Sequence, residues 1–209
     1  LRIQDEPLQG FHFGRVAARA GRNAQVAAFS ASFGAALARN DASVVLDGEG
    51  AQSVLDGIYA LAGHQQCDVY TTLDHAQPHG ASHENYRGVL DAHSCAVFNG
   101  RIVVRPHAQK TDAIQRNGNL LLSKDATVHT RPQLEIYAND VKCTHGATIG
   151  MLRPEALFYL QSRGIGAQEA RRILVEAFIA ETIPESAPQA VRDALLTRVG
   201  RFLSTEKQP

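Results

Sequence analysis

Short apolar runs separated by turn residues occupy the chain up to about residue 150. Glycine, asparagine and aspartate lie between many of the runs, as in Asp47-Gly48, Asn117-Gly118-Asn119 and Asn139-Asp140, and these residues tolerate turn conformations. Runs of this length fit strands better than helices. The pattern therefore predicts a mainly β structure, with strands at Gln25–Phe29, Ser43–Leu46, Cys67–Thr71, Ala96–Phe98, Arg101–Val104, Asn119–Leu122, Ala126–Thr130, Leu134–Tyr137 and Val141–Cys143.

The spacing of these runs does not decide how the strands assemble. A sandwich, a barrel and a stacked β-solenoid all give short strands with turns between them. One local feature favours a hairpin, because the Asn-Gly pair in Phe98-Asn99-Gly100-Arg101 suits a two-residue primed turn. We therefore expect a turn at this point and leave the sheet architecture open.

After about residue 150 the apolar spacing becomes helical. Pro154 suits the first turn of a helix, and Gly164 suits the residue that ends it. A second helix carries one apolar stripe, and Ser186-Ala187-Pro188-Gln189 resembles a capping box that opens a third. The sequence thus predicts a β domain over residues 1–150 and a C-terminal helical domain over residues 151–209. The stripe of the second helix comprises Ala170, Ile173, Leu174, Ala177 and Phe178.

The charge balance argues against polyanionic partners. Lysine plus arginine and aspartate plus glutamate number 21 each, so there is no broad field to attract nucleic acid or an anionic membrane. No apolar run reaches the roughly 18 residues that a membrane span needs, and the start of the chain lacks a signal-peptide pattern. We expect a soluble, cytoplasmic protein. Because the chain begins at Leu1 and its single methionine is Met151, we also expect it to be a piece of a longer polypeptide.

The three cysteines, Cys67, Cys95 and Cys143, are far apart and form no C-x-x-C pair. This spacing indicates neither a disulfide framework nor a self-contained zinc or cluster site. Thiol chemistry would therefore need ligands from a partner. The pattern assigns no role to Cys67 or Cys95.

Two constellations are candidate sites. His75, His79 and His83 follow one another at intervals of four, which would align them on one helix face as metal ligands. Pro78 and Gly80 argue against a helix here, so a polar turn whose histidines form hydrogen bonds is the favoured interpretation.

The segment Val141-Lys142-Cys143-Thr144-His145-Gly146 is the second constellation. In a strand, Cys143 and His145 would project from the same face, about 6.6–6.8 Å apart along the chain. A thiolate and an imidazole so placed could meet one metal or one partner surface. From spacing alone, a buried cysteine beside a hydrogen-bonded histidine is the more common arrangement. The chain has neither a phosphate-binding glycine loop nor a G-x-S-x-G nucleophile motif, so no active site is predicted.

Several longer stretches together resemble the SufB/SufD family of iron–sulfur cluster assembly proteins. The resemblance covers residues 74–181 and favours the SufD branch, because Cys143 precedes His145 and Gly146 follows it. It implies a right-handed parallel β-helix followed by a C-terminal helical domain. The stretches are Val97–Val104, Ala108–Ala113, Asn119–Leu122, Pro132–Ala138, Asp140–Thr148, Phe158–Leu160 and Ser162–Ile165.

The resemblance also implies a function. The chain would be a non-catalytic scaffold that pairs with a SufB-like subunit through its last β-helix strands and docks an ABC-type ATPase through its helices. Cys143 and His145 would then help to hold a nascent, transient iron–sulfur cluster shared with the partner, and the isolated chain could form a homodimer. The alternatives from other classes are a polysaccharide-active β-helix enzyme and a small metalloenzyme built on His75, His79 and His83.

Overall fold

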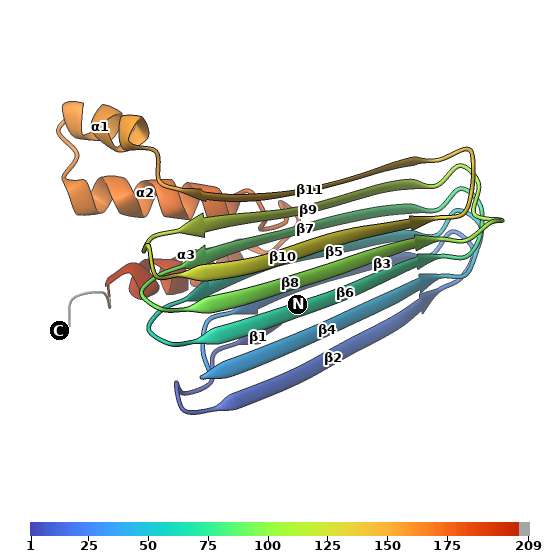
Figure 1. The fold of residues 1–209 in the computed structure, drawn as a ribbon, viewed down its shortest axis with the longest axis horizontal. Helices are drawn as coiled ribbons and strands as arrows, with labels where there is room; N and C mark the ends of the chain where they lie inside the picture. The colour runs from blue at the N-terminus through green and yellow to red at the C-terminus, as the bar shows by residue number, and fades with distance from the viewer. Residues whose placement is uncertain (205–209) are drawn as a thin grey trace.

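The computed structural model describes residues 1–204, which form a parallel β-solenoid of about five turns followed by three helices, of which the second and third pack against it (Figure 1). The mainly β prediction and the β-helix class are both confirmed. The strands are β1 (Arg2–Gln4), β2 (Phe11–Ala20), β3 (Gln25–Ser32), β4 (Leu37–Leu46), β5 (Gln52–Leu61), β6 (Gln66–His75), β7 (Ala81–Leu90), β8 (Cys95–Val104), β9 (Asp112–Leu121), β10 (Thr127–Ile136) and β11 (Lys142–Met151). The helices are α1 (Pro154–Ser162), α2 (Ala167–Ala180) and α3 (Gln189–Ser204).

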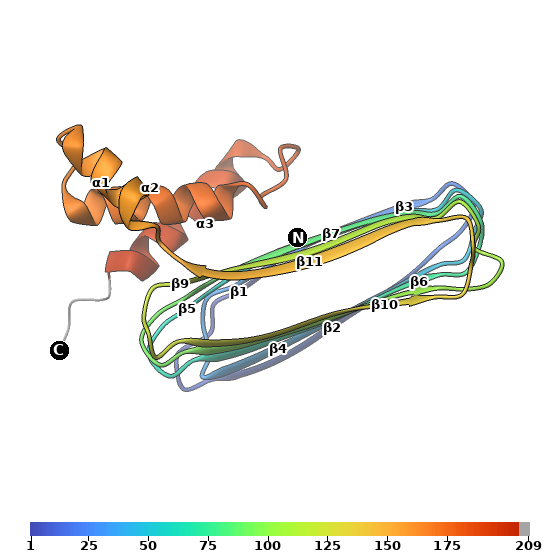
Figure 2. The same cartoon turned by 45° about the horizontal axis from the view of Figure 1, so that its top comes forward.

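Consecutive strands alternate between two sheets. The odd-numbered strands form one sheet in the order β1-β3-β5-β7-β9-β11, and the even-numbered strands form the other in the order β10-β8-β6-β4-β2. We call these the odd sheet and the even sheet. All strand pairs are parallel, so each residue lies beside the equivalent residue of the previous turn. The two sheets enclose a narrow interior, which we call the lumen (Figure 2).

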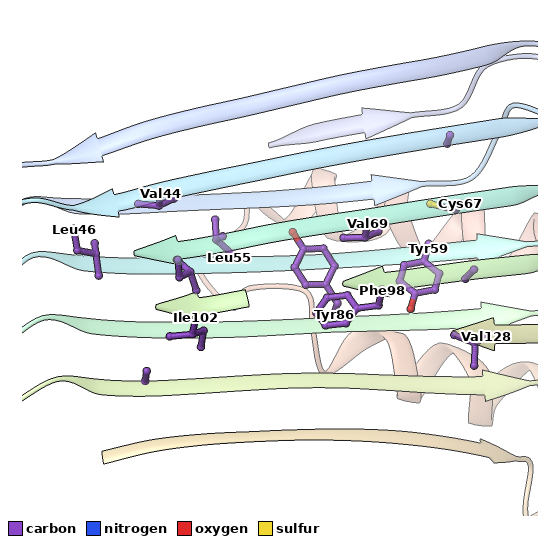
Figure 3. Packing of buried hydrophobic residues seen from close by; sticks show 14 of the residues in the cluster. Val44, Leu46, Leu55, Tyr59, Cys67, Val69, Tyr86, Phe98, Ile102 and Val128 are labelled. Atoms are coloured by element: carbon purple, nitrogen blue, oxygen red, sulfur yellow. The ribbon is translucent and has the colours of Figure 1, made fainter. Parts of the chain in front are cut away.

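The lumen holds the larger hydrophobic core because side chains alternate across each strand. On β6, for example, Cys67, Val69 and Leu73 face inward and are buried. Figure 3 shows the rings of Tyr86 and Phe98 between the sheets, and their centroids are 5.5 Å apart. Stacking of these inward rows from turn to turn gives a continuous core that no single turn could bury.

Two predicted turns are wrong, and the lumen explains both. Asn99-Gly100 lies in the middle of β8, where Gly100 leaves room for the Gln115 amide and the Phe98 ring. Asn117-Gly118-Asn119 lies inside β9. The Asn117 amide donates to the Tyr59 hydroxyl at 3.2 Å, and that hydroxyl donates to Asn119 Oδ1 at 2.5 Å. These polar residues serve as hydrogen-bonding partners inside the stack rather than as turn formers.

Helices α2 and α3 cover one end of the outer face of the odd sheet. Ile58 and Val89 of the sheet share a buried cluster with Val175 and Ile179 of α2 and with residues of α3. The buried residues of α2 are Ala170, Val175 and Ile179, so they coincide with the predicted stripe at Ala170 alone.

Arg87 of β7 fixes α2 to the odd sheet. Its guanidinium donates to the Phe178 carbonyl at 2.6 Å, lies 4.8 Å from the centre of the Phe178 ring and pairs with Glu181 at 2.5 Å. The helices are therefore attached to the solenoid by ionic as well as apolar contacts.

Helix α1 is placed differently. It begins at Pro154 as predicted, and Gly164 has a φ of 84° just beyond its end. It contacts α2 and projects away from the sheets (Figures 1 and 2). Phe158 is 71% exposed and Tyr159 is 57% exposed, so α1 presents an aromatic surface to solvent.

Candidate functional site at the open end of the solenoid

The last turn of the solenoid, formed by β10 and β11, has no further turn stacked on it. Its lumen-facing side chains are therefore more exposed than their counterparts in the inner turns. Ile149 is 51% exposed, whereas its neighbour Asn119 in β9 is buried. Ile136 and Met151 at the same end are also exposed. This open end presents two free strand edges around an uncovered apolar layer.

Cys143 and His145 lie in this layer. They face the lumen side of β11, because their neighbours in β9, Ala113 and Gln115, are buried inward-facing residues. Cys143 is partly buried and His145 is exposed. Both side chains thus point to the same side of β11, and both can contact a molecule that binds at the open end.

The Cys143 thiol is held in its protonated form. Burial raises its pKa above the usual value, and the nearby Asp112 carboxylate acts in the same direction. A hydrogen bond with the Ala113 backbone opposes this rise without cancelling it. A metal that binds the sulfur must therefore displace a proton, which makes binding weaker at lower pH.

A shallow hollow lies at the same end of the solenoid, where it reaches β11 at Ile149. It has a volume of about 470 Å³ and lies between the last two even strands and β11. Phe98 and Val128 contribute apolar surface, while Thr130 and His129 contribute polar groups. The open end therefore combines the Cys143 thiol, the His145 imidazole and a partly apolar recess that His129 also lines.

A buried polar pair lies directly behind His145. Gln115 of β9 is the neighbour of His145, and Glu84 of β7 is the neighbour of Gln115. Both side chains are fully buried, and Gln115 Nε2 donates to Glu84 Oε2 at 2.7 Å. Burial raises the pKa of Glu84 to about 7, against the opposing effect of the hydrogen bond from Gln115. Sequence reasoning missed both residues, although their spacing of 31 and 30 positions along the chain is the solenoid period.

The structure does not bring His75, His79 and His83 together. His75 is buried in the lumen from the even sheet, where its Nε2 lies 2.9 Å from Ser82 Oγ and burial lowers its pKa to about 4. His79 lies in a turn with a φ of 59°, and His83 lies on the outer face of the odd sheet, 3.8 Å from Asp56. The interval of four residues therefore places His75 in the even sheet, His79 in the turn between the sheets and His83 in the odd sheet. Within residues 1–204, no three side chains of histidine, cysteine, aspartate or glutamate are grouped to hold a metal.

The other two cysteines lie away from the open end. Cys67 is fully buried in the lumen, and burial raises its pKa to about 12. Cys95 is partly buried at the start of β8, where burial also raises its pKa. Neither lies in the layer of Cys143 and His145.

The comparison with known families decides how this geometry is interpreted. Residues 1–178 match the family model described as the SUF system FeS cluster assembly, SufBD core domain. The chain belongs to the SufBD family. The recognition made from the sequence motifs is therefore confirmed, and the family replaces the alternative of a polysaccharide-active enzyme.

Several curated relatives of this SufBD chain are similar over most of its length. The chain is 40% identical over 178 residues to the iron-sulfur cluster assembly protein SufD of Escherichia coli (strain K12), covering 84% of this chain and 42% of the relative. It is 35% identical over 185 residues to the SufBD family protein slr0076 of Synechocystis, covering 88% and 41%. It is 34% identical over 203 residues to the chloroplastic protein ABCI7 of Arabidopsis thaliana, covering 96% and 42%. The chain thus spans about two fifths of these relatives.

No helix within residues 1–204 of this SufBD chain is long and apolar enough to cross a membrane. One of the relatives, ABCI7, is named as chloroplastic. The cytoplasmic location expected from the sequence stays a prediction.

Proposed function

We propose that this chain is the C-terminal part of a non-catalytic scaffold subunit that holds nascent iron–sulfur species at the open end of its solenoid. The observation that carries the proposal is the placement of Cys143 and His145 on one side of an uncovered edge strand. Membership of a family described by iron–sulfur cluster assembly supports the same conclusion.

The partner at this end is a second solenoid subunit of the same family, of the SufB type. The free edges of β10 and β11 can form parallel or antiparallel ladders with another chain. The exposed Ile136, Ile149 and Met151 would continue the apolar core into that chain. Such an interface would bury the apolar layer together with Cys143 and His145.

Two protein ligands are too few for a stable cluster. A sulfur and an imidazole nitrogen are suitable ligands for iron, but iron–sulfur clusters are usually held by four protein ligands. The partner must supply the others at the shared interface. The cluster would then be transient cargo of the complex rather than a resident group of this chain.

The second docking surface belongs to the helices. The resemblance implies that an ABC-type ATPase docks on the C-terminal helices. Of these, α2 buries Val175 and Ile179 in a cluster shared with the solenoid and α3. The exposed Phe158 and Tyr159 make α1 the better surface for that partner. Aromatic side chains that are large and exposed are common anchors at protein interfaces.

The decisive experiment uses the full-length protein, co-expressed with its SufB-like and ATPase partners and purified without oxygen. His145→Ala and Cys143→Ser should leave assembly of the complex intact and lower its iron and sulfide content several-fold. Thr144→Val is the matched control, because Thr144 lies between the two residues on the opposite side of β11. Wild-type iron and sulfide content in both variants would mean that Cys143 and His145 serve only in interface packing. A stable complex of two copies of this chain would instead indicate a homodimer.

A further inference from the structure

The buried pair behind His145 forms a column of three polar side chains in the lumen. Neighbouring strands are about 4.8 Å apart, so Gln115 lies one strand behind His145 and Glu84 one strand behind Gln115. The next residue in the column, Leu55, is buried and apolar. The polar column therefore ends at Glu84 on one side and opens at His145 on the other.

The orientation of the Gln115 amide is fixed by its surroundings. Its nitrogen donates to Glu84 Oε2 and lies against Gly100 of β8, which belongs to the preceding turn. The amide oxygen Oε1 is the end of the group that this hydrogen bond leaves unused. Within residues 1–204 this buried oxygen has no hydrogen-bond partner. A buried acceptor without a partner destabilises the fold, which makes a donor in the last turn strongly favourable.

Two residues of the last turn occupy the position beyond Gln115. On β10 it is Pro132, the neighbour of Gly100, and proline has no N–H to donate. On β11 it is His145, whose ring carries an N–H in either tautomer. His145 is thus the side chain in this position that can satisfy the amide oxygen.

We propose that Gln115 is a positioning residue for His145, and that Glu84 sets the direction of its amide. The Gln115 oxygen accepts the N–H of the ring nitrogen that faces it. The other ring nitrogen is then unprotonated and turned outward, where its lone pair can bind iron. A hydrogen bond to one ring nitrogen is a general way to fix which nitrogen of a histidine binds a metal. This inference rests on the proposed role of His145.

The test measures the tautomer of His145 directly. The full-length protein, labelled with ¹⁵N-histidine, is assembled with unlabelled partners and sedimented for solid-state NMR at a pH where imidazole is neutral. The His145 signal is identified by its loss in His145→Ala. Wild-type protein should show one dominant tautomer, and Gln115→Met should change the tautomer ratio about fivefold, the value of one hydrogen bond of ordinary strength.

Two further variants separate positioning from general disturbance of the lumen. Glu84→Gln keeps a side chain of the same shape but allows the Gln115 amide to turn over, so the tautomer ratio should shift in the same direction as in Gln115→Met. Thr130→Val removes a buried hydroxyl of the last turn that also has no hydrogen-bond partner within residues 1–204 and is the rival donor, so an unchanged ratio is expected if His145 is the donor. If Gln115→Met does not fold, Glu84→Gln alone tests the orientation of the amide.

The outcomes distinguish this inference from the proposed function. An unchanged ratio in both Gln115→Met and Glu84→Gln would overturn the positioning role, whatever happens to the cluster. A shifted ratio together with wild-type iron and sulfide would support positioning and overturn the proposed role of His145. A shifted ratio with reduced iron and sulfide would support both.

Discussion

Glu84 allows a test of how burial in the lumen changes the pKa of a carboxyl group, because its side chain is fully buried. Its pKa is about 7 in the folded chain and 4.5 in the unfolded reference, so the folded state binds this proton more tightly. Burial is the largest cause of the raised pKa, and the charge of Asp56 raises it further. The hydrogen bond from Gln115 and the charge of His83 lower it. Glu84→Gln removes the ionisable group and preserves the shape.

The sign of the effect follows from linkage. Well below pH 4.5 the carboxyl is protonated in both states, and its ionisation costs the fold nothing. Between pH 4.5 and 7 the unfolded chain ionises first, so stability falls as the pH rises. Above pH 7 the full cost applies, and at 1.36 kcal/mol per pH unit it comes to about 3 kcal/mol.

The assay is urea unfolding at pH 4.5 and at pH 8. The free energy of unfolding of Glu84→Gln should match the wild type within about 1 kcal/mol at pH 4.5 and exceed it by about 3 kcal/mol at pH 8. Glu185→Gln, at an exposed position after α2, is the control and should show no such pH-dependent difference. A variant that is equally or less stable than the wild type at pH 8 would refute the argument. A stabilised variant would also show that Glu84 lowers the stability of the wild-type fold.

Two other outcomes follow from features described above. Arg87→Met should lower the free energy of unfolding by about 1–3 kcal/mol and increase amide hydrogen exchange in α2, because the Phe178 carbonyl and Glu181 lose their charged partner. Arg116→Met, on the same outer face of the odd sheet but exposed, should change neither quantity. Binding of Fe²⁺ to the partner-bound complex should weaken about tenfold for each pH unit below the pKa of Cys143, which burial raises, because the metal must displace the thiol proton. Anaerobic titrations between about pH 6.5 and 8 would measure this slope, and Cys143→Ser should reduce it by the share of this thiol.

The local pattern of apolar and polar residues was sufficient to predict some features of this structure. The change from short runs to helical spacing near residue 150 marks the point where strands give way to helices, and Pro154 begins α1. Alternation within one strand also put Cys143 and His145 on the same side of β11, because that property depends on neighbouring residues alone.

Other features depend on contacts between turns and could not be read locally. Asn99-Gly100 and Asn117-Gly118-Asn119 have the composition of turns, yet inside the solenoid the neighbouring turns surround Gly100 and supply hydrogen bonds to Asn117 and Asn119. The column of Glu84, Gln115 and His145 appears only when the register from one turn to the next is known. The interval of four between His75, His79 and His83 misled for the same reason, since it crosses a turn between sheets.

Pro132 gives the two free edges at the open end different capacities for pairing. Proline in a sheet lies on an edge strand with its N–H-deficient side toward solvent. The free edge of β10 therefore presents an interrupted row of donors, whereas β11 contains no proline and presents an unbroken row. An incoming strand can pair along the whole of β11 but only on either side of Pro132 on β10. Unwanted edge-to-edge stacking of isolated chains at this end should accordingly concentrate on β11, the strand whose pairing also covers Cys143 and His145.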